Sequence, residues 1–255
     1  MTRRRVLLAS LALATLLGRT SLCQERASPP AFVGEKLRYV MTILGIVGGE
    51  LILTAEETKW EGRPAYRFEL SALSNDFLSK FFLVRDDMVS WVDPKTFRSL
   101  RFEKHSVEGK RVRDELTEFD YERGTARIDG ETKPLLDATL DTLSSVYYLR
   151  TLDLDKTKPL ELAVFSRQSY LLRVDIQAKE RISTPAGSFD TIRVEPKSEG
   201  ANLLGKNLVL WLTDDERKVP VQLKSKLKVG TLIGKLKAIE HRPEGPPFDT
   251  NSVKP

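Results

Sequence analysis

The stretch RISTPAGSFDTIRVEP, residues 181–196, decides how the chain is interpreted, because its composition fits two different structures. A proline, a glycine, a serine and an aspartate lie close together there, as they do in catalytic loops and in tight turns. Apolar and polar residues alternate on both sides, at 172–176 and at 192–194, as expected for two strands. Pro185 fixes φ and Gly187 supplies a positive φ, which are requirements of a turn. We therefore interpret the stretch as a hairpin that sets strand register.

The same alternation with a period of two residues recurs along the chain, for example at 66–70 and at 160–164. Short turn signals rich in glycine, proline and acidic residues separate these runs, which favours an antiparallel sheet with one buried and one wet face. Two segments break the pattern, because residues 75–82 and 141–152 place apolar side chains at helical spacing. The expected fold class is therefore mainly β, with two short helices laid against one large sheet.

Residues 219–239 carry a change of pattern that affects the predicted shape of the sheet. Apolar side chains occupy one parity as far as Val229 and the other parity after Gly230. A shift of one residue moves side chains to the opposite face of a sheet, and Gly230 and Gly234 can accommodate a bulge or bend. We therefore expect a strongly curved antiparallel sheet, an open or half-closed barrel, with the two helices on its concave side.

The N-terminus has the pattern of a secretory signal peptide. Three arginines at 3–5 precede an apolar run at 6–17, which is too short to span a bilayer comfortably. Small residues before a cut after Cys23 complete the pattern, so we expect residues 1–23 to be removed and the protein to be periplasmic. Leu22 disfavours lipidation of Cys23, and the arginines leave the general secretory and twin-arginine export routes both open.

The remainder of the chain is expected to form a single domain. Residues 24–31 are a short N-terminal lead, and no linker or repeat divides residues 32–240. The last residues, 241–255, are rich in proline and poor in apolar side chains, which predicts a disordered tail.

The charge of the chain is concentrated in its signal segment. The full sequence has 41 basic and 36 acidic residues, a net charge of +5. Four of the basic residues, the arginines at 3, 4, 5 and 19, belong to that segment, which leaves 37 − 36 = +1 for the mature chain. This balance gives no indication of nucleic-acid binding. The single cysteine lies in the same segment, so we expect no disulfide.

The sequence carries no recognisable catalytic or metal-binding motif. Its two histidines, His105 and His241, are far apart, and neither a G-x-S-x-G elbow nor a phosphate-binding glycine loop occurs. The acidic clusters at 86–87 and 214–216 lack the spacing of a calcium loop. We therefore expect no catalytic residue, no metal and no cofactor, and we favour a protein that is not an enzyme.

Aromatic residues are the candidates for a ligand site, because a curved sheet that does not close can line an apolar pocket. Arg150 falls on the apolar face of its predicted helix, where the charge needs an acidic partner such as Asp141 or Asp86. Lysines at 224, 226 and 228 form a stripe that can contact anionic lipid headgroups, or can simply be solvated. The candidate ligand-binding residues are Phe77, Phe81, Phe82, Trp91, Tyr147, Arg150 and Trp211.

Five segments in order resemble a family of exported bacterial proteins, the DUF3108 family. They are FVGEKLRYVMTILGIVGGELIL (32–53), FFLVRDDMVSWVD (81–93), DTLSSVYYLRTL (141–152), KERISTPAGSFDTIRVEP (179–196) and LVLWLTDDERKVPVQL (208–223). The resemblance implies a curved antiparallel sheet with helices on its concave side, similar in outline to periplasmic lipoprotein carriers. It implies no activity and transfers no catalytic residue, and fold analogy alone does not establish function.

These observations lead to one leading hypothesis and two alternatives. The first is an exported, periplasmic, non-enzymatic protein that binds an apolar or amphiphilic envelope component, such as a lipid, or that assists envelope biogenesis. The alternatives are a hydrolase that acts on an envelope polymer and a structural partner of a larger envelope complex. We expect no nucleic-acid partner, and peripheral contact with the membrane and the oligomeric state are left open.

Overall fold

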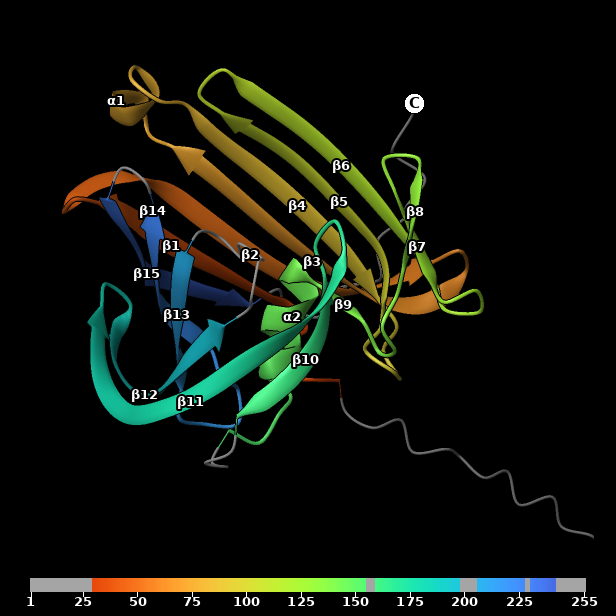
Figure 1. Ribbon diagram of the computed structural model, residues 1–255. Coiled ribbons are helices and arrows are strands. Elements are labelled where there is room, and N and C mark those ends of the chain that lie inside the picture. Colours follow the sequence, from red (N-terminus) through yellow and green to blue (C-terminus); the bar gives the residue numbers. More distant parts are fainter. Residues whose placement is uncertain (1–28, 155–158, 198–205, 228–229, 242–255) are drawn as a thin grey trace, which may run out of the picture.

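The computed structural model describes residues 29–154, 159–197, 206–227 and 230–241. These residues form one 15-stranded sheet and two short helices (Figure 1), which confirms the mainly β fold class. Neither helix in this part of the chain is long and apolar enough to cross a membrane. The predicted signal peptide (1–23), most of the lead (24–31) and all but the first residue of the predicted tail (241–255) lie outside the described residues.

The elements follow one another in a chain of short hairpins. They are β1 (Glu35–Ile43), β2 (Ile46–Trp60), β3 (Arg63–Ser74), α1 (Asp76–Ser79), β4 (Val84–Val92), β5 (Ser99–Glu108), β6 (Arg111–Asp120), β7 (Thr125–Ile128), β8 (Glu131–Pro134), β9 (Leu140–Asp141), α2 (Thr142–Leu149), β10 (Leu160–Phe165), β11 (Ser169–Thr184), β12 (Gly187–Lys197), β13 (Lys206–Thr213), β14 (Pro220–Leu227) and β15 (Gly230–His241).

The strand order shows that the sheet is open. It runs β8-β7-β6-β5-β4-β3-β2-β1-β15-β14-β13-β12-β11-β10-β9, and every pair is antiparallel except β9 with β10. Pairing of β1 with β15 joins the two runs of sequential strands. The outermost strands, β8 and β9, do not pair with each other. The sheet is neither closed nor strongly curled, so the strong curvature of a half-closed barrel, which we expected, is not found.

The change of parity in residues 219–239 has a different cause from the one we expected. The segment is two strands, β14 and β15, which pair antiparallel with Leu227 opposite Gly230. Because a hairpin turn resets which positions face the core, the change requires no bend within a strand. Gly234 has another role, since a Cβ there would lie 2.7 Å from the sulfur of Met41 on the neighbouring strand.

The hairpin predicted for residues 181–196 is confirmed. β11 and β12 pair up to Thr184 opposite Gly187, and two residues form the turn between them. Gly187 has a φ of 132°, a region that L residues rarely adopt. The turn also reaches another part of the sheet, because the Ala186 amide donates a hydrogen bond of 3.1 Å to the carbonyl of Leu236 on β15.

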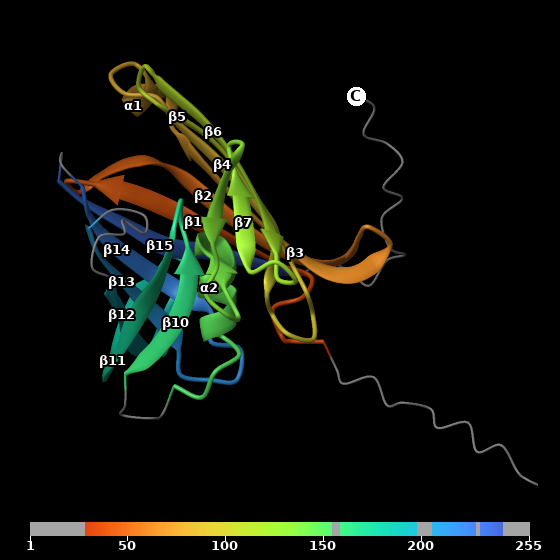
Figure 2. The same cartoon turned by 45° about the vertical axis from the view of Figure 1, so that its right-hand side comes forward.

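The helix α2 lies in the interior of the fold, whereas α1 does not cover the sheet. α2 contacts β3 and β4 as well as β9 and β10 (Figure 2), strands that are far apart in the strand order. The ring of Tyr147 stacks on Phe68 of β3 with centroids 4.0 Å apart, and Phe32 packs edge-on against both. α1 has no buried residue and lies in the β3–β4 connection, so the expectation of two helices on the concave side does not hold for α1.

A buried carboxylate fixes the start of α2. Asp141 accepts hydrogen bonds from the amides of Leu143 and Ser144, both at 2.9 Å. Its second oxygen accepts from the hydroxyls of Ser90 on β4 and Ser99 on β5. Burial raises the pKa of the Asp141 carboxyl, although the serine hydrogen bonds oppose this effect. The cap thus ties α2 to two strands through hydrogen bonds from neutral groups.

We predict that the buried Asp141 carboxyl makes the free energy of unfolding fall as pH rises above 3.8, the ordinary pKa of an aspartate. Between that value and the raised pKa, the folded chain keeps a proton that the unfolded chain has lost, so the free energy of unfolding falls with pH. In Asp141→Asn, a neutral amide can still accept both helix hydrogen bonds. Urea unfolding across pH should therefore show the variant gaining stability relative to the natural protein as pH rises.

The control for this prediction is Asp93→Asn, which removes a carboxylate that accepts backbone hydrogen bonds in a partly exposed turn. A difference between Asp141→Asn and the natural protein that stays constant over pH would contradict the assignment.

Candidate functional site

The seven candidate ligand-binding residues do not form one pocket, because the structure places them in three separate regions. Tyr147, Arg150 and Trp211 are buried in the interior, Trp91 is half-buried on β4, and Phe77, Phe81 and Phe82 lie at one end of the sheet. The binding of a ligand by any of them stays a prediction. Each region is described in turn below.

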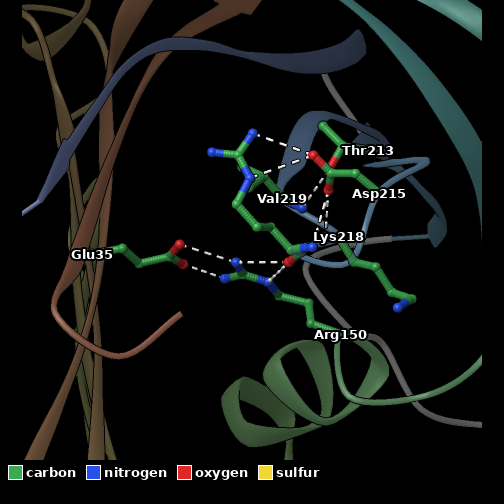
Figure 3. A network of polar contacts seen from close by, with 7 residues as sticks. Glu35, Arg150, Thr213, Asp215, Lys218 and Val219 are labelled. Carbon is green, nitrogen blue, oxygen red and sulfur yellow. Dashed lines mark hydrogen bonds and ion pairs between the residues drawn. The ribbon is translucent and has the colours of Figure 1, made fainter. Parts of the chain in front are cut away.

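Arg150 belongs to a buried ion pair (Figure 3). Its guanidinium contacts both carboxylate oxygens of Glu35, one of them at 2.9 Å, and the two side chains are only 1% and 2% exposed. The guanidinium also donates to the backbone carbonyl of Arg217 at 3.2 and 3.1 Å. The rings of Phe32 and Tyr147 lie 5.4 and 5.6 Å from its central carbon. Every guanidinium nitrogen therefore has a partner.

The partner of Arg150 differs from the one expected from the sequence. Asp141 caps α2 and Asp86 lies on β4, so neither pairs with Arg150, whereas Glu35 opens β1. The pair connects the end of α2, the start of β1 and the connection between β13 and β14. It is a structural junction, since the guanidinium is buried and uses all three of its nitrogens to bind Glu35 and the Arg217 carbonyl.

The β13–β14 connection is itself held by a carboxylate (Figure 3). Asp215 accepts hydrogen bonds from the hydroxyl of Thr213 at 2.6 Å and from the amide of Lys218 at 3.1 Å. Partial burial raises the pKa of the Asp215 carboxyl, but these hydrogen bonds and Arg217 outweigh it and lower the pKa below its ordinary value. The loop therefore presents the Arg217 carbonyl to Arg150 in a fixed position.

A small open hollow of about 240 Å³ lies beside the ion pair. It is lined by residues 30–32, Arg150, Thr151 and residues 216–218. Four of the eight lining residues are charged, and the hollow lies at the surface, so it differs from the apolar pocket predicted between sheet and helix. That predicted space contains the buried aromatic cluster around Phe32. Within the described part of the chain, no three histidine, cysteine or acidic side chains gather as a metal ion would need.

The two tryptophans among the candidates differ in burial, because Trp211 on β13 belongs to the core whereas Trp91 on β4 is half-buried. Trp91 packs against Trp60 with ring centroids 5.2 Å apart, and the guanidinium of Arg67 lies 5.7 Å above it. The Trp211 indole donates a hydrogen bond of 2.7 Å to Glu180. Both rings are thus occupied by neighbouring side chains.

The third region is an exposed apolar surface at one end of the sheet, which we call the apolar tip. Phe77, Phe81 and Phe82 are 59%, 76% and 49% exposed there. The described residues contain twelve exposed large apolar side chains, and eight of them are in the tip. The tip consists of Leu44, Ile46, Val47, Leu73, Phe77, Phe81, Phe82 and Leu83.

Three connections at the same end of the sheet bring the tip together. Asn75 caps α1 through the amide of Leu78 and also donates to the carbonyl of Val47 at 2.8 Å, which joins the α1 segment to β2. The amide of Gly109, in the β5–β6 turn, donates to the carbonyl of Leu83 at 2.7 Å. A Cβ on Gly109 would lie 2.9 Å from the Phe82 ring. The tip is therefore a defined surface.

Sequence reasoning found three of the eight residues of this surface and assigned them to the interior. The helical spacing of the phenylalanines indicated an apolar face, which we assigned to the interior because large apolar side chains are usually buried. Leu44, Ile46 and Val47 were missed, since they flank a glycine in sequence that resembles an ordinary strand and turn. The signal that could have identified them is an apolar residue directly before Gly45 in a two-residue turn.

The sequence profile of the family described as "Protein of unknown function (DUF3108)" matches residues 38–237. The chain belongs to the DUF3108 family. No curated protein matches the sequence. The match confirms the resemblance inferred from the five segments, and the family description assigns no activity from which site residues could be transferred.

Solved structures show what this DUF3108 chain is similar to in fold. A β-barrel-like protein of the DUF1849 family from Brucella abortus has a TM-score of 0.55 at 10% identity, over 83% of this chain and 99% of that chain. A protein named as a lipoprotein from Parabacteroides distasonis has a TM-score of 0.34 at 11% identity, over 83% and 97% of the two chains. An exported protein of YmcC-like fold from Bacteroides fragilis has a TM-score of 0.30 at 9% identity, over 83% and 98%. Only the first supports an argument, and that argument concerns the fold.

We predict that Glu35→Gln destabilises this DUF3108 protein by about 3 kcal/mol, because it leaves the buried Arg150 charge without its partner. Replacing both residues, in Glu35→Leu/Arg150→Met, should restore much of the loss, since neither charge is then buried. Denaturant unfolding measures all three free energies.

The exposed pair of Arg38 on β1 with Glu240 on β15 is the matched control. Its removal by Arg38→Gln should change stability by no more than about 1 kcal/mol. An equal effect of Arg38→Gln and Glu35→Gln would show that burial of the pair is unimportant.

Proposed function

We propose that this protein is an exported, non-enzymatic protein of the periplasm whose apolar tip binds an apolar or amphiphilic component of the cell envelope. The observation that carries the proposal is the concentration of eight exposed apolar side chains at one end of the sheet. Contiguous exposed apolar surface on a folded protein is typical of an interaction site. The predicted signal peptide at residues 1–23 supports a location outside the cytoplasm.

The energetic reason for binding is the exposure itself. Burying a large apolar side chain completely stabilises a complex by roughly 1.5–3 kcal/mol. The most exposed members of the tip, Phe81 and Leu44, are 76% and 73% accessible to water. A ligand that covers them removes most of that area from water, so the tip gains from an apolar partner even without a specific hydrogen bond.

The interior offers less support for the same function. The hollow that we predicted between sheet and helix contains stacked rings, among them Phe68 and Tyr147. Arg150 is engaged by Glu35, and the buried Asp141 is engaged by hydroxyl and amide donors. A binding function therefore finds its best site at the surface, and the same contacts give no support to the alternative of a hydrolase centred on Arg150.

A structural partner in a larger envelope complex is the second candidate function. It is favoured by the outer edge of β6, which pairs with β7 only from Thr117 to Asp120. The other half of β6 carries Val112, which is 59% exposed. A strand from another protein can add to such an edge. This candidate predicts binding to a protein and no binding to amphiphiles.

We predict that the purified protein binds micelles of a non-ionic detergent and that Phe77→Ser/Phe81→Ser reduces binding by about tenfold, since two large side chains lose their buried area. Sedimentation with micelles measures the bound fraction. Leu136→Ser/Leu171→Ser is the matched control, because these two side chains are exposed elsewhere. Equal loss in both double variants, or no micelle binding by the natural protein, would refute a role of the tip.

A further inference from the structure

We propose that the apolar tip docks onto the surface of an anionic lipid bilayer. In this arrangement Leu44, Phe77 and Phe81 enter the headgroup region, and neighbouring cations contact the lipid phosphates. The inference rests on the proposed function, because it names the amphiphilic component that the tip binds. Three features of the structure support it: the charges around the tip, the chemistry of one turn and the shape of the surface.

Four cationic side chains surround the apolar tip. Lys80 follows α1 between Phe77 and Phe81, Arg85 is the second residue of β4, and Lys110 and Arg111 follow Gly109, on which Phe82 packs. All four are exposed, and among the described residues none of them forms an ion pair.

Several other cations on the sheet have acidic partners. Arg67 pairs with Glu56 and Glu69, and Arg101 pairs with Glu103 and Glu118. The acids near the tip are the exposed Asp76 and Glu108, Glu50, which pairs with Lys237, and the half-buried Asp86 and Asp87. Exposed cations without an acidic partner among the described residues, next to apolar side chains, match the negative surface of an anionic membrane.

The turn between β1 and β2 has an apolar residue where turn chemistry favours a polar one. Leu44 and Gly45 have φ values of 51° and 81°, and positive φ at both positions is the requirement of the type I′ turn. Two other hairpins use the same pattern, with Glu61 before Gly62 and Asp129 before Gly130. Asn and Asp tolerate this region better than Leu does. The choice of Leu44 is therefore not explained by the turn.

The shape of the surface favours a bilayer over a single apolar ligand. α1 and the β5–β6 turn project at the upper end of the sheet (Figures 1 and 2), whereas small-molecule sites are concave. Phenylalanine and leucine on a projecting surface, with lysine and arginine around them, are typical of segments that lie at a membrane interface. Lys224 and Lys226, part of the lysine stripe, are exposed on β14, and Lys228 lies outside the described residues.

The test is flotation of the purified, naturally processed protein with phosphatidylcholine vesicles, with and without phosphatidylglycerol. We expect binding to be about tenfold stronger with the anionic lipid and to weaken at high salt, as electrostatic attachment does. Lys110→Gln/Arg111→Gln should lower binding several-fold on anionic vesicles and have little effect on neutral ones.

The decisive variant is Leu44→Asn. Because asparagine suits the type I′ turn, the variant should fold with unchanged or higher thermal stability and should still lose binding several-fold. Glu61→Asn makes the corresponding change in the turn between β2 and β3 and should leave binding unchanged. Undiminished binding in Leu44→Asn, or equal binding to neutral and anionic vesicles, would overturn the inference.

The two proposals can fail separately. Binding to detergent micelles without binding to anionic vesicles would reject bilayer docking and leave the proposed function intact. Loss of both would reject both. Binding to vesicles that Phe77→Ser/Phe81→Ser does not diminish would place the contact outside the tip and would also reject the inference.

Discussion

The burial of α2 against one open sheet is the constraint on which the rest of the structure depends. A helix of eight residues is unstable alone, so it relies on packing and on polar groups at its two ends. Asp141 fixes the first turn to β4 and β5, and Arg150 fixes the last turn to Glu35 on β1. Between them Tyr147 stacks on β3. The helix thereby joins both halves of the strand order.

The aromatic packing around α2 moves the expected function to the periphery. The same hydrophobic effect acts on Phe68 and on Phe81, yet the first has a ring partner inside and the second is 76% exposed. The exposed rings stand at the end of the sheet where three connections converge, beside cations that lack acidic partners among the described residues. A surface that combines these features is better suited to binding a partner than to catalysing a reaction.

Short sequence patterns predicted those parts of the fold that depend on residues close together in the chain. The hairpin at 181–196 follows from its proline, its glycine and the alternation around it, and it is confirmed. Residues 219–239 were misinterpreted because a bulge and a hairpin both change parity. The spacing of Phe77, Phe81 and Phe82 identifies an apolar face, but it does not say whether a core lies opposite. Glu35 lies 115 residues before Arg150, and no sequence pattern links such a pair.

The most direct test of a membrane-facing tip is an environment-sensitive fluorophore placed at each end of the sheet. The only cysteine lies in the predicted signal peptide, so Phe81→Cys and Glu61→Cys allow selective labelling of the processed protein. With anionic vesicles, emission from position 81 should shift to the blue and emission from position 61 should not change. A shift at position 61, or none at position 81, would contradict the assignment of the apolar tip as the binding surface.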